Sequence, residues 1–540
     1  MIKLFLFLSL IFASLDAKIT LEEISTKPTS RAKDFMIWQY LKQNISDAQA
    51  KQAYEQSTKH NRKIKRLYAK KVKQKDPYIV YKNKCQKKRD LFSIQDKKCF
   101  KLALSPYKTL AMTPDERRKL AKKVVSKRFV KLLNIQNEPY VASAYKNYPA
   151  DVVLRMFIYT TRSHRRQNLN IQLNKKLINS LASSSKIHYF IKMVIRDKKL
   201  DKLQQSLFLL DSPKLNATDN FRLALFHLQH KHKKEALKHL EEALKKYKKR
   251  DEIDKINFWI YLITKNREAL DALVQSSGIN VYTLFAHEKK HIKVTNYFTT
   301  LPTSKIKSPI NLSDPFAWQT LRLKIRKTPK EQLPRLALDY KAVCLLPVQA
   351  YIVEKSQDFK VHAFIMPYEK YLKDVSVDDK ALIYAIMRQE SQFIPCALSS
   401  SFALGLMQIM PFLTDALSKE MHQKISYSDM FLPQVNLKYA RKHLTWMKKS
   451  LSHPLFLAYA YNGGLGFLKK HLRGGAFQSK KYEPYLSMEL MQNVQSREYG
   501  KKVLANYVMY KNILGEKVSI IHLFQTLKDS MKTSRYAKKK

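Results

Sequence analysis

Glycine is nearly absent from the first three quarters of this 540-residue chain. Only nine glycines are present, and Gly278 is the only one before Gly405. Lys, Leu, Ala and Gln, which all favour helices, are common over the same stretch. The sequence therefore predicts a mainly α fold, in which helix follows helix across tight polar turns.

Residues 221–247 show this helical pattern. Leu223, Phe226 and His227 begin one helical stripe. A second stripe follows: Ala236, Leu237, Leu240, Ala243, Leu244 and Tyr247. Helix pairs of this kind stack into α-solenoids. Since no strict repeat period is visible, we expect degenerate repeats.

The two ends of the chain carry export and surface signals. An apolar run from Leu4 to Leu15 follows an early lysine, and the small residue Ala17 comes shortly after it. The run is too short to span a bilayer, so we interpret residues 1–17 as a cleaved signal peptide. No cysteine near that site could accept a lipid. Residues 526–540 are expected to form a solvated basic tail.

The chain is strongly basic, with a formal net charge of +57 from 101 Lys plus Arg against 44 Asp plus Glu. Such a charge attracts a polyanionic wall or an anionic membrane surface. Nucleic acid is disfavoured as a partner because the signal peptide exports the chain. A solvated, lysine-rich surface without a partner is an equally good interpretation.

Four cysteines are present: Cys85, Cys99, Cys344 and Cys396. In an oxidising compartment Cys85 and Cys99 can close a short loop. Cys344 and Cys396 are either free and buried or paired with each other. Because no CxxC spacing occurs, a thiolate zinc site is not expected.

A candidate acid lies on a helix predicted to begin after Ser376, with Asp379 as the partner in a capping box. Four residues recur at helical spacing on one face of it: Ile383, Ile386, Met387 and Glu390. Desolvation on such a face raises the pKa of a carboxyl group, as a general acid at neutral pH requires. The alternative is an ordinary helix-end glutamate that reaches water.

Three motifs accompany this glutamate: RQES at 388–391, GLMQIMP at 405–411 and AYNGG at 460–464. Together they resemble the catalytic domain of soluble lytic transglycosylases, over roughly residues 365–515. The resemblance implies a lysozyme-like catalytic domain at 351–525 and an N-terminal α-superhelical domain at 18–345, with a linker subdomain near 300–350. It also implies that Glu390 is the sole catalytic acid/base and that neither a metal nor an organic cofactor is needed.

The same resemblance assigns substrate-binding roles to residues around the acid: Ser391, Ser399, Met407, Gln408, Met410, Tyr461 and Asn462. Ser391 and Ser399 would form the floor and the sugar-contacting wall of the site. Tyr461 would hydrogen-bond the catalytic carboxyl. For the two methionines, filling the core is the alternative.

A fourth family element, E-T-R-x-Y, appears here as QSREY. Gln495 stands at the glutamate position, while Arg497 and Tyr499 match, and the resemblance assigns all three to substrate binding. Because an amide does not ionise, we expect Gln495 to bind or position substrate. Two further departures affect loop shape: Leu465 replaces a usual proline and Phe402 a usual glycine.

The implied reaction cleaves the bond between N-acetylmuramic acid and N-acetylglucosamine in peptidoglycan and leaves a 1,6-anhydro end. The implied location is the periplasm, and other wall enzymes and the membrane surface are further candidate partners. A goose-type lysozyme is the nearest alternative and needs a second carboxylate, for which three candidates exist: Asp415, Glu420 and Asp429. A non-catalytic wall-binding scaffold is another alternative.

Two histidine patterns compete with this interpretation. HEKKH at 287–291 matches the HExxH pattern of zinc proteases, with His287 and His291 as ligands and Glu288 as base, but no third ligand is evident. His227, His230 and His232 also cluster, and we expect them to lie on a solvated helix surface.

Overall fold

The computed structural model of the chain describes residues 18–72, 77–478 and 480–528. Within these ranges the chain forms thirty-one α-helices, and the only sheet has two short strands. The predicted mainly α fold is therefore confirmed. The expected signal peptide at 1–17 and most of the expected basic tail lie outside the described residues. None of the helices in the described ranges combines the length and the apolar character that a membrane span requires.

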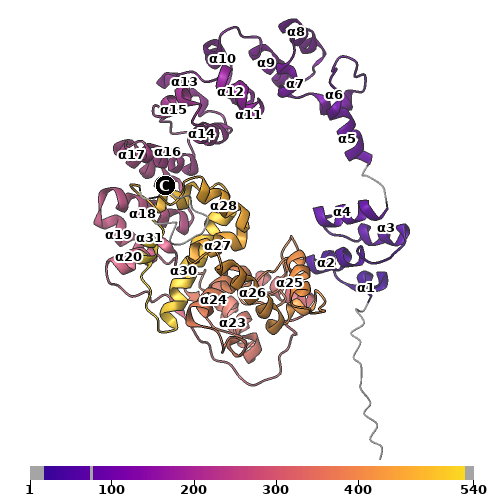
Figure 1. The fold of residues 1–540 in the computed structure, drawn as a ribbon, viewed down its shortest axis with the longest axis vertical. Helices are drawn as coiled ribbons and strands as arrows, with labels where there is room; N and C mark the ends of the chain where they lie inside the picture. Colours follow the sequence, from indigo (N-terminus) through magenta and orange to yellow (C-terminus); the bar gives the residue numbers. More distant parts are fainter. Residues whose placement is uncertain (1–17, 73–76, 479, 529–540) are drawn as a thin grey trace, which may run out of the picture. The chain divides into compact units, whose positions relative to one another are not determined.

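Contacts within the chain divide it into two compact units (Figure 1). The inserted unit is Lys75–Gly278, and the main unit combines Met1–Gln74 with Ile279–Lys540. The main unit thus combines the first four helices and the segment 279–345 with the three motifs, while the expected domain boundary near residue 345 stays a prediction.

The inserted unit is a succession of short helices. Their bounds are α5 (Pro77–Lys87), α6 (Lys97–Ala103), α7 (Pro106–Leu110), α8 (Pro114–Lys123), α9 (Lys127–Ile135), α10 (Val141–Asn147), α11 (Ala150–Tyr159), α12 (Arg162–Asn168), α13 (Lys175–Leu181), α14 (Ile187–Arg196), α15 (Asp201–Leu207), α16 (Ala217–Gln229), α17 (Lys233–Lys246), α18 (Arg250–Thr264) and α19 (Arg267–Val274). Neighbours such as α16 and α17 pack side by side as helix pairs, as the stripes in 221–247 predict.

The histidines of the α16–α17 turn differ from expectation in one respect. His230 and His232 are exposed, as predicted for a helix surface. His227 is only 1% exposed, because it lies on the buried stripe of α16 that also carries Leu223.

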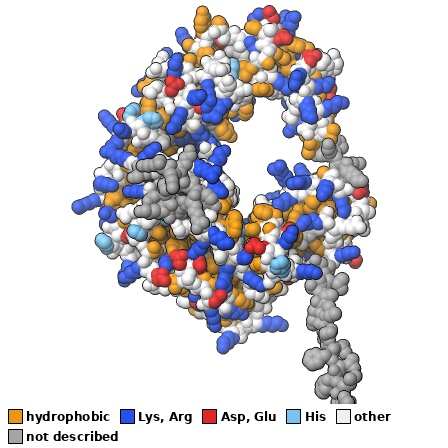
Figure 2. All heavy atoms as spheres, in the orientation of Figure 1, with side chains coloured by type: hydrophobic (Ala, Val, Ile, Leu, Met, Phe, Trp, Pro, Cys, Tyr) orange, Lys and Arg blue, Asp and Glu red, His pale blue; other side chains and the backbone are white. Residues whose placement is uncertain are grey.

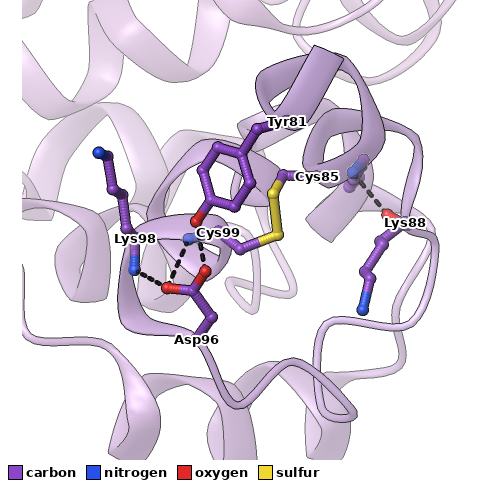
Figure 3. Close-up of a disulfide and its surroundings, with 7 residues drawn as sticks. Tyr81, Cys85, Lys88, Asp96, Lys98 and Cys99 are labelled. Atoms are coloured by element: carbon purple, nitrogen blue, oxygen red, sulfur yellow. Dashed lines mark hydrogen bonds between the residues drawn. A yellow bond between two sulfur atoms is a disulfide. The ribbon is translucent and has the colours of Figure 1, made fainter. Parts of the chain in front are cut away.

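A disulfide between Cys85 and Cys99 joins α5 to α6, with their Cα atoms 5.1 Å apart (Figure 3). Asp96 caps α6 beside it by accepting from the backbone N–H groups of Lys98 at 2.8 Å and Cys99 at 3.3 Å. The bond lies in a small hydrophobic core that also contains Leu91. The pairing that the short spacing allows, and that the sequence left open, is therefore present.

The other two cysteines are not bonded to each other. Cys344 is exposed and Cys396 is buried. Both are therefore free thiols, and only Cys396 is buried as expected.

The main unit holds the remaining elements. Its α-helices are α1 (Leu21–Thr26), α2 (Arg31–Tyr40), α3 (Asp47–Glu55), α4 (Arg62–Lys71), α20 (Val281–Lys289), α21 (Pro315–Lys327), α22 (Leu333–Leu338), α23 (Leu346–Ser356), α24 (Val377–Ser391), α25 (Pro411–Glu420), α26 (Pro433–Lys448), α27 (Pro454–Gly463), α28 (Leu465–Arg473), α29 (Tyr485–Leu490), α30 (Val494–Ile513) and α31 (Ile520–Thr526). Its 3-10 helices are η1 (Lys330–Gln332), η2 (Val343–Leu345), η3 (Glu369–Tyr371) and η4 (Asp429–Phe431). Strands β1 (Tyr297–Phe298) and β2 (His362–Ala363) pair in parallel.

Helix α30 is the central element of the main unit, because both α24 and α27 pack against it (Figure 1). The contact with α27 is close: a Cβ atom on Gly500 would lie 2.2 Å from the Tyr459 ring. Arg388 of α24 connects to α30 by donating to Asn506 Oδ1 at 3.1 Å. The same guanidinium donates to Glu354 of α23 at 3.1 Å. This three-helix arrangement brings the ends of α24, α27 and α30 together.

The N-terminal helix α2 packs on the loop that follows α24. Phe35 and Trp38 contact the Phe402 ring, with centroids 5.4 and 5.6 Å apart. Arg31 donates to the Leu398 carbonyl at 2.8 Å, and Lys63 of α4 donates to that of Ser401 at 2.6 Å. Phe402 adopts a left-handed φ of 61°, which explains why glycine is usual there. Here the side chain is retained because it completes an aromatic cluster.

Candidate functional site

Helix α24 places Glu390 one residue before its end. Ser376 caps the helix as predicted by accepting from the Asp379 N–H at 3.2 Å, but the Asp379 side chain does not make the reciprocal bond of a capping box. Ile383, Ile386 and Met387 are buried on the expected face. The helix then ends in a left-handed turn at Gln392, where φ is 50°. Glu390 is thus at the junction of a buried helix and a loop.

The Glu390 carboxyl lies in an environment that disfavours its charge. Burial raises its pKa from 4.5 to about 7, and the nearby Tyr499 hydroxyl opposes that shift. Among the described residues, no Lys or Arg forms a salt bridge with Glu390. The side chain is nonetheless only half-buried. The group can therefore hold a proton near neutral pH and still meet a ligand.

Two tyrosines border this carboxyl. The Tyr499 hydroxyl of α30 is buried and has no hydrogen-bond partner of normal geometry among the described residues. It nonetheless lies close enough to Glu390 to lower the pKa of that carboxyl. The Tyr461 hydroxyl of α27 donates to the Met407 carbonyl at 2.7 Å. The expected bond from Tyr461 to Glu390 is not made; instead, Tyr461 holds the loop opposite the acid.

The GLMQ segment forms a tight loop pinned by a buried amide. Asn436 of α26 accepts from the Met407 N–H at 2.9 Å and donates to the carbonyls of Leu404 at 3.0 Å and Met430 at 2.8 Å. Gly405 has φ of 75°, and a Cβ there would lie 2.2 Å from both Asn436 Nδ2 and the Met430 carbonyl oxygen. Only glycine fits this approach. Sequence reasoning missed Asn436, because no local pattern marks its role.

The methionines and the glutamine of this loop have different environments. Met407 is fully buried, so its side chain fills the core. Met410 is half-buried at the start of α25. Gln408, at φ of 48°, donates to the carbonyls of Ala397 at 2.9 Å and Gly405 at 2.8 Å. Of the three, Met410 and Gln408 remain partly exposed and can line a groove.

Three smaller predicted site residues are engaged within the protein. Ser391 is buried, and its hydroxyl donates to the Met387 carbonyl at 3.2 Å. Ser399 Oγ accepts from the Ala403 N–H at 2.9 Å. Asn462 Oδ1 accepts from the Ser496 hydroxyl at 3.0 Å. Ser391 therefore supports the helix end, whereas Ser399 and Asn462 shape loops and stay half-buried.

The QSREY segment forms the first turns of α30. Gln495 is exposed. Arg497 donates to Glu498 Oε1 at 2.7 Å and to the Glu489 carbonyl at 3.0 Å, and these acidic neighbours raise its pKa against the opposing effect of burial. Arg497 therefore anchors the turn that presents Tyr499.

The three candidates for a second carboxylate have local partners. Asp415 accepts from the Tyr427 hydroxyl at 2.8 Å, Glu420 pairs with Lys442 at 3.0 Å, and Asp429 accepts from the Ser426 N–H at 2.7 Å. In the described part of the chain, no recorded contact joins any of them to Glu390.

An aromatic surface that sequence reasoning missed extends outward from Tyr461. The His443 ring lies 5.9 Å from the Tyr461 ring and stacks on Trp446 at 5.8 Å. Trp446 is 51% exposed. Exposed aromatic faces of this kind can cover the apolar face of a sugar ring.

The HEKKH segment does not form the arrangement that a zinc protease needs. Helix α20 ends at Lys289, so His291 lies beyond it with φ of 57°. Glu288 accepts from the Ile520 N–H at 2.7 Å at the start of α31. Glu288 is thus used as a helix cap.

Comparisons with known proteins match the part of the chain that carries Glu390 and Tyr461. Residues 368–483 match the family model described as the transglycosylase SLT domain. The soluble lytic murein transglycosylase of Escherichia coli (strain K12) is 28% identical over 211 residues, which cover 38% of this chain and 32% of that protein. A putative soluble lytic murein transglycosylase of Haemophilus influenzae is 32% identical over 180 residues, which cover 32% of this chain and 29% of that protein.

A solved structure is also similar. It is an inactive mutant of the lytic transglycosylase Slt from Pseudomonas aeruginosa, with a TM-score of 0.49 and 14% identity, covering 92% of this chain and 89% of that one. The sequence matches to the curated relatives span only about a third of their length. Residues 368–483 of this chain are thus similar to the transglycosylase SLT domain.

Proposed function

We propose that this protein is a lytic transglycosylase that cleaves the β-1,4 bond between N-acetylmuramic acid and N-acetylglucosamine in peptidoglycan. One observation carries the proposal: within an SLT domain, the half-buried Glu390 has its pKa raised to about 7 and has no salt-bridge partner among the described residues. A carboxyl group in this state can serve first as an acid and then as a base at neutral pH.

In the first step, protonated Glu390 donates its proton to the glycosidic oxygen. The bond from C1 of the muramic acid residue to that oxygen breaks, and the N-acetylglucosamine residue leaves with a free hydroxyl. The 2-acetamido carbonyl oxygen of the muramic acid stabilises the positive charge at C1. Glu390 is now a carboxylate, and the low-polarity surroundings that raised its pKa favour its recapture of a proton.

In the second step, the Glu390 carboxylate removes the proton from the C6 hydroxyl of the same muramic acid. The C6 oxygen attacks C1, the acetamido group is released, and a 1,6-anhydro ring closes. No water enters the product, and Glu390 is returned to its protonated form.

The surroundings of Glu390 favour ring closure over hydrolysis. Glycosidases that use water or a covalent intermediate place a second carboxylate across the bond. Asp415, Glu420 and Asp429 are each engaged with local partners, as described above. A single carboxyl that serves both steps removes the need for a second one.

We further propose that the protein acts in the periplasm on glycan strands. The N-terminal apolar segment supports export, and the Cys85–Cys99 disulfide is typical of an oxidising compartment. Figure 2 shows Lys and Arg side chains spread over the visible face of the molecule, which suits encounter with a polyanionic wall or an anionic membrane surface.

The experiment is to incubate purified peptidoglycan with the mature protein and measure the soluble muropeptides released. We expect Glu390→Gln to reduce the rate by about 1,000-fold, because the amide can neither donate nor recapture the proton. Glu420→Gln is the matched control, since it removes an exposed carboxylate of the same domain, and it should retain full activity.

Two outcomes would contradict the proposal. Equal rates for the wild-type protein and Glu390→Gln would remove Glu390 from the chemistry. No release by the wild-type protein, on intact sacculi and on glycan strands stripped of peptides, would favour a wall-binding scaffold.

A further inference from the structure

The turn between α16 and α17 in the inserted unit gathers side chains that ligate metals. His227 lies in the last turn of α16, His232 immediately precedes α17, and Glu235 lies in the first turn of α17. One ligand atom from each of these side chains lies within 4.8 Å of the other two. This cluster belongs to neither the candidate site in the main unit nor the HEKKH segment.

His227 is the unusual member of the cluster. Its side chain is 1% exposed, yet neither ring nitrogen has a hydrogen-bond partner within the described residues. Buried polar atoms are rarely left in this condition, because they have lost the water that would otherwise bind them. An unpartnered pair of imidazole nitrogens therefore points to a ligand.

The neighbouring aromatic rings do not satisfy these nitrogens. Phe208 packs 5.5 Å from the His227 ring and offers no acceptor or donor. His239 stacks at 5.3 Å, but its Nδ1 is bonded to Asn220 Oδ1 at 2.9 Å.

His232 and Glu235 approach His227 from the partner helix. His232 occupies the N-cap position of α17, but its side chain makes no capping hydrogen bond. The backbone fixes the turn, since the His232 N–H donates to the His227 carbonyl at 3.0 Å and Lys231 takes a left-handed φ of 68°. Both side chains are exposed, so they can rotate without disturbing the core.

We propose that His227, His232 and Glu235 bind a divalent transition metal ion of the zinc type, with water completing the coordination. Two imidazoles and one carboxylate form a donor set that Zn²⁺ accepts. Ligand atoms around tetrahedral Zn²⁺ lie about 3.3 Å apart, as bonds of about 2 Å require. Small rotations of His232 and Glu235 bring the cluster to that spacing.

The bound ion would join α16 to α17 and give one of the two unpartnered ring nitrogens of His227 a partner. Its surroundings are otherwise unfavourable to a cation, because Lys231, Lys233 and Lys234 flank the turn and the N-terminus of α17 is partially positive. Binding must therefore depend on the three ligands themselves, with Glu235 supplying the negative charge. Removal of either exposed ligand should accordingly have a large effect.

The test is equilibrium binding of Zn²⁺ alone to the full chain after chelator treatment, measured by competition with a chromogenic chelator. We expect one site whose affinity falls at least about 10-fold in His232→Ala and in Glu235→Gln. His230→Ala is the matched control: its exposed ring lies in the same turn, but its Nδ1 is bonded to the Phe226 carbonyl at 2.8 Å. The control should keep the site.

Co²⁺ provides a second readout that does not depend on affinity. The wild-type protein and His230→Ala should show the visible absorption bands of four-coordinate cobalt, and Glu235→Gln should lose them. Circular dichroism checks that each variant is folded, and the two exposed positions avoid disturbing the core at His227. The proposal is wrong if the wild-type chain binds no Zn²⁺, or if His232→Ala and Glu235→Gln both bind it with the same affinity as the wild-type protein.

Discussion

At the scale of single residues, the proposed reaction depends on whether the fold keeps the Glu390 carboxyl protonated. The Glu390 carboxyl is half-buried, and its pKa is about 7. Sequence reasoning found this residue from helical spacing and motif context. It did not find the arrangement of the tyrosines, because whether Tyr461 or Tyr499 acts on Glu390 depends on the packing of α27 and α30 and not on either motif alone.

The raised pKa of Glu390 should be measurable as a stability difference. The folded state binds the Glu390 proton more tightly than the unfolded state does. The contribution of this proton to the free energy of unfolding is therefore fully present below pH 4.5 and is lost as pH rises to about 7. Glu390→Gln carries no such loss. We expect it to be more stable than the wild-type protein by up to about 3 kcal/mol at pH 8 and nearly equal to it at pH 4.

Thermal unfolding of the wild-type protein and Glu390→Gln at pH 4 and at pH 8 provides the measurement. A stability gap between Glu390→Gln and the wild-type protein that is the same at pH 4 and pH 8 would contradict a perturbed Glu390.

Substitution of Tyr499 and substitution of Tyr461 should change the pH dependence of activity in different ways. Activity should fall above about pH 7 as Glu390 ionises. The Tyr499 hydroxyl lowers the pKa of Glu390, so Tyr499→Phe should move this alkaline limb to higher pH. Tyr461→Phe should lower the maximal rate and leave the limb in place, because its hydroxyl bonds the Met407 carbonyl. Rate–pH profiles decide this, and the same shift in both variants would contradict the assignment.

At the scale of elements, the sequence predicted the helix that carries the acid but not the partner that holds its loop. The Ser376 cap and the apolar face of α24 are local signals, and both are present in the structure. Asn436 lies 29 residues from the Met407 N–H that it binds, and that distance in sequence leaves no pattern. The need for glycine at 405 became clear only from this contact.

Gly405→Ala should test that contact. The new Cβ would be 2.2 Å from the Met430 carbonyl oxygen and from Asn436 Nδ2, at φ of 75°. Gly464→Ala is a matched control, because Gly464 has φ of 84° and nothing within 4 Å of the corresponding Cβ. We expect Gly405→Ala to cost at least about 2 kcal/mol more than the control in denaturant unfolding. Equal losses would mean that only backbone strain matters there.

At the scale of the whole molecule, a chain nearly free of glycine predicted a helical protein, and this is confirmed. The division of the chain into two compact units could not be predicted from the sequence. Helices α1–α4 belong to the main unit because α2 packs its Phe35 and Trp38 on Phe402, a contact across more than 350 residues of sequence. Helical periodicity shows which face of α2 is apolar but not which surface that face covers.

The cysteines provide a test of the inserted unit. The Cys85–Cys99 bond should stabilise it by about 3 kcal/mol through loop closure. Reduction should therefore lower the unfolding temperature of the inserted unit. Without reductant, an alkylating reagent should label Cys344 in the native protein and Cys396 only after denaturation. Rapid native labelling of both would contradict the buried position of Cys396.

The central claim is that one carboxyl group performs both steps and that no water enters the product. The mass of the muropeptides released by the wild-type protein tests it most directly, with borohydride reduction as a check on the chain ends. We predict products lighter by one water than hydrolysis products and resistant to reduction. Products with the full mass of hydrolysis and reducible ends would contradict the account and identify the enzyme as a lysozyme.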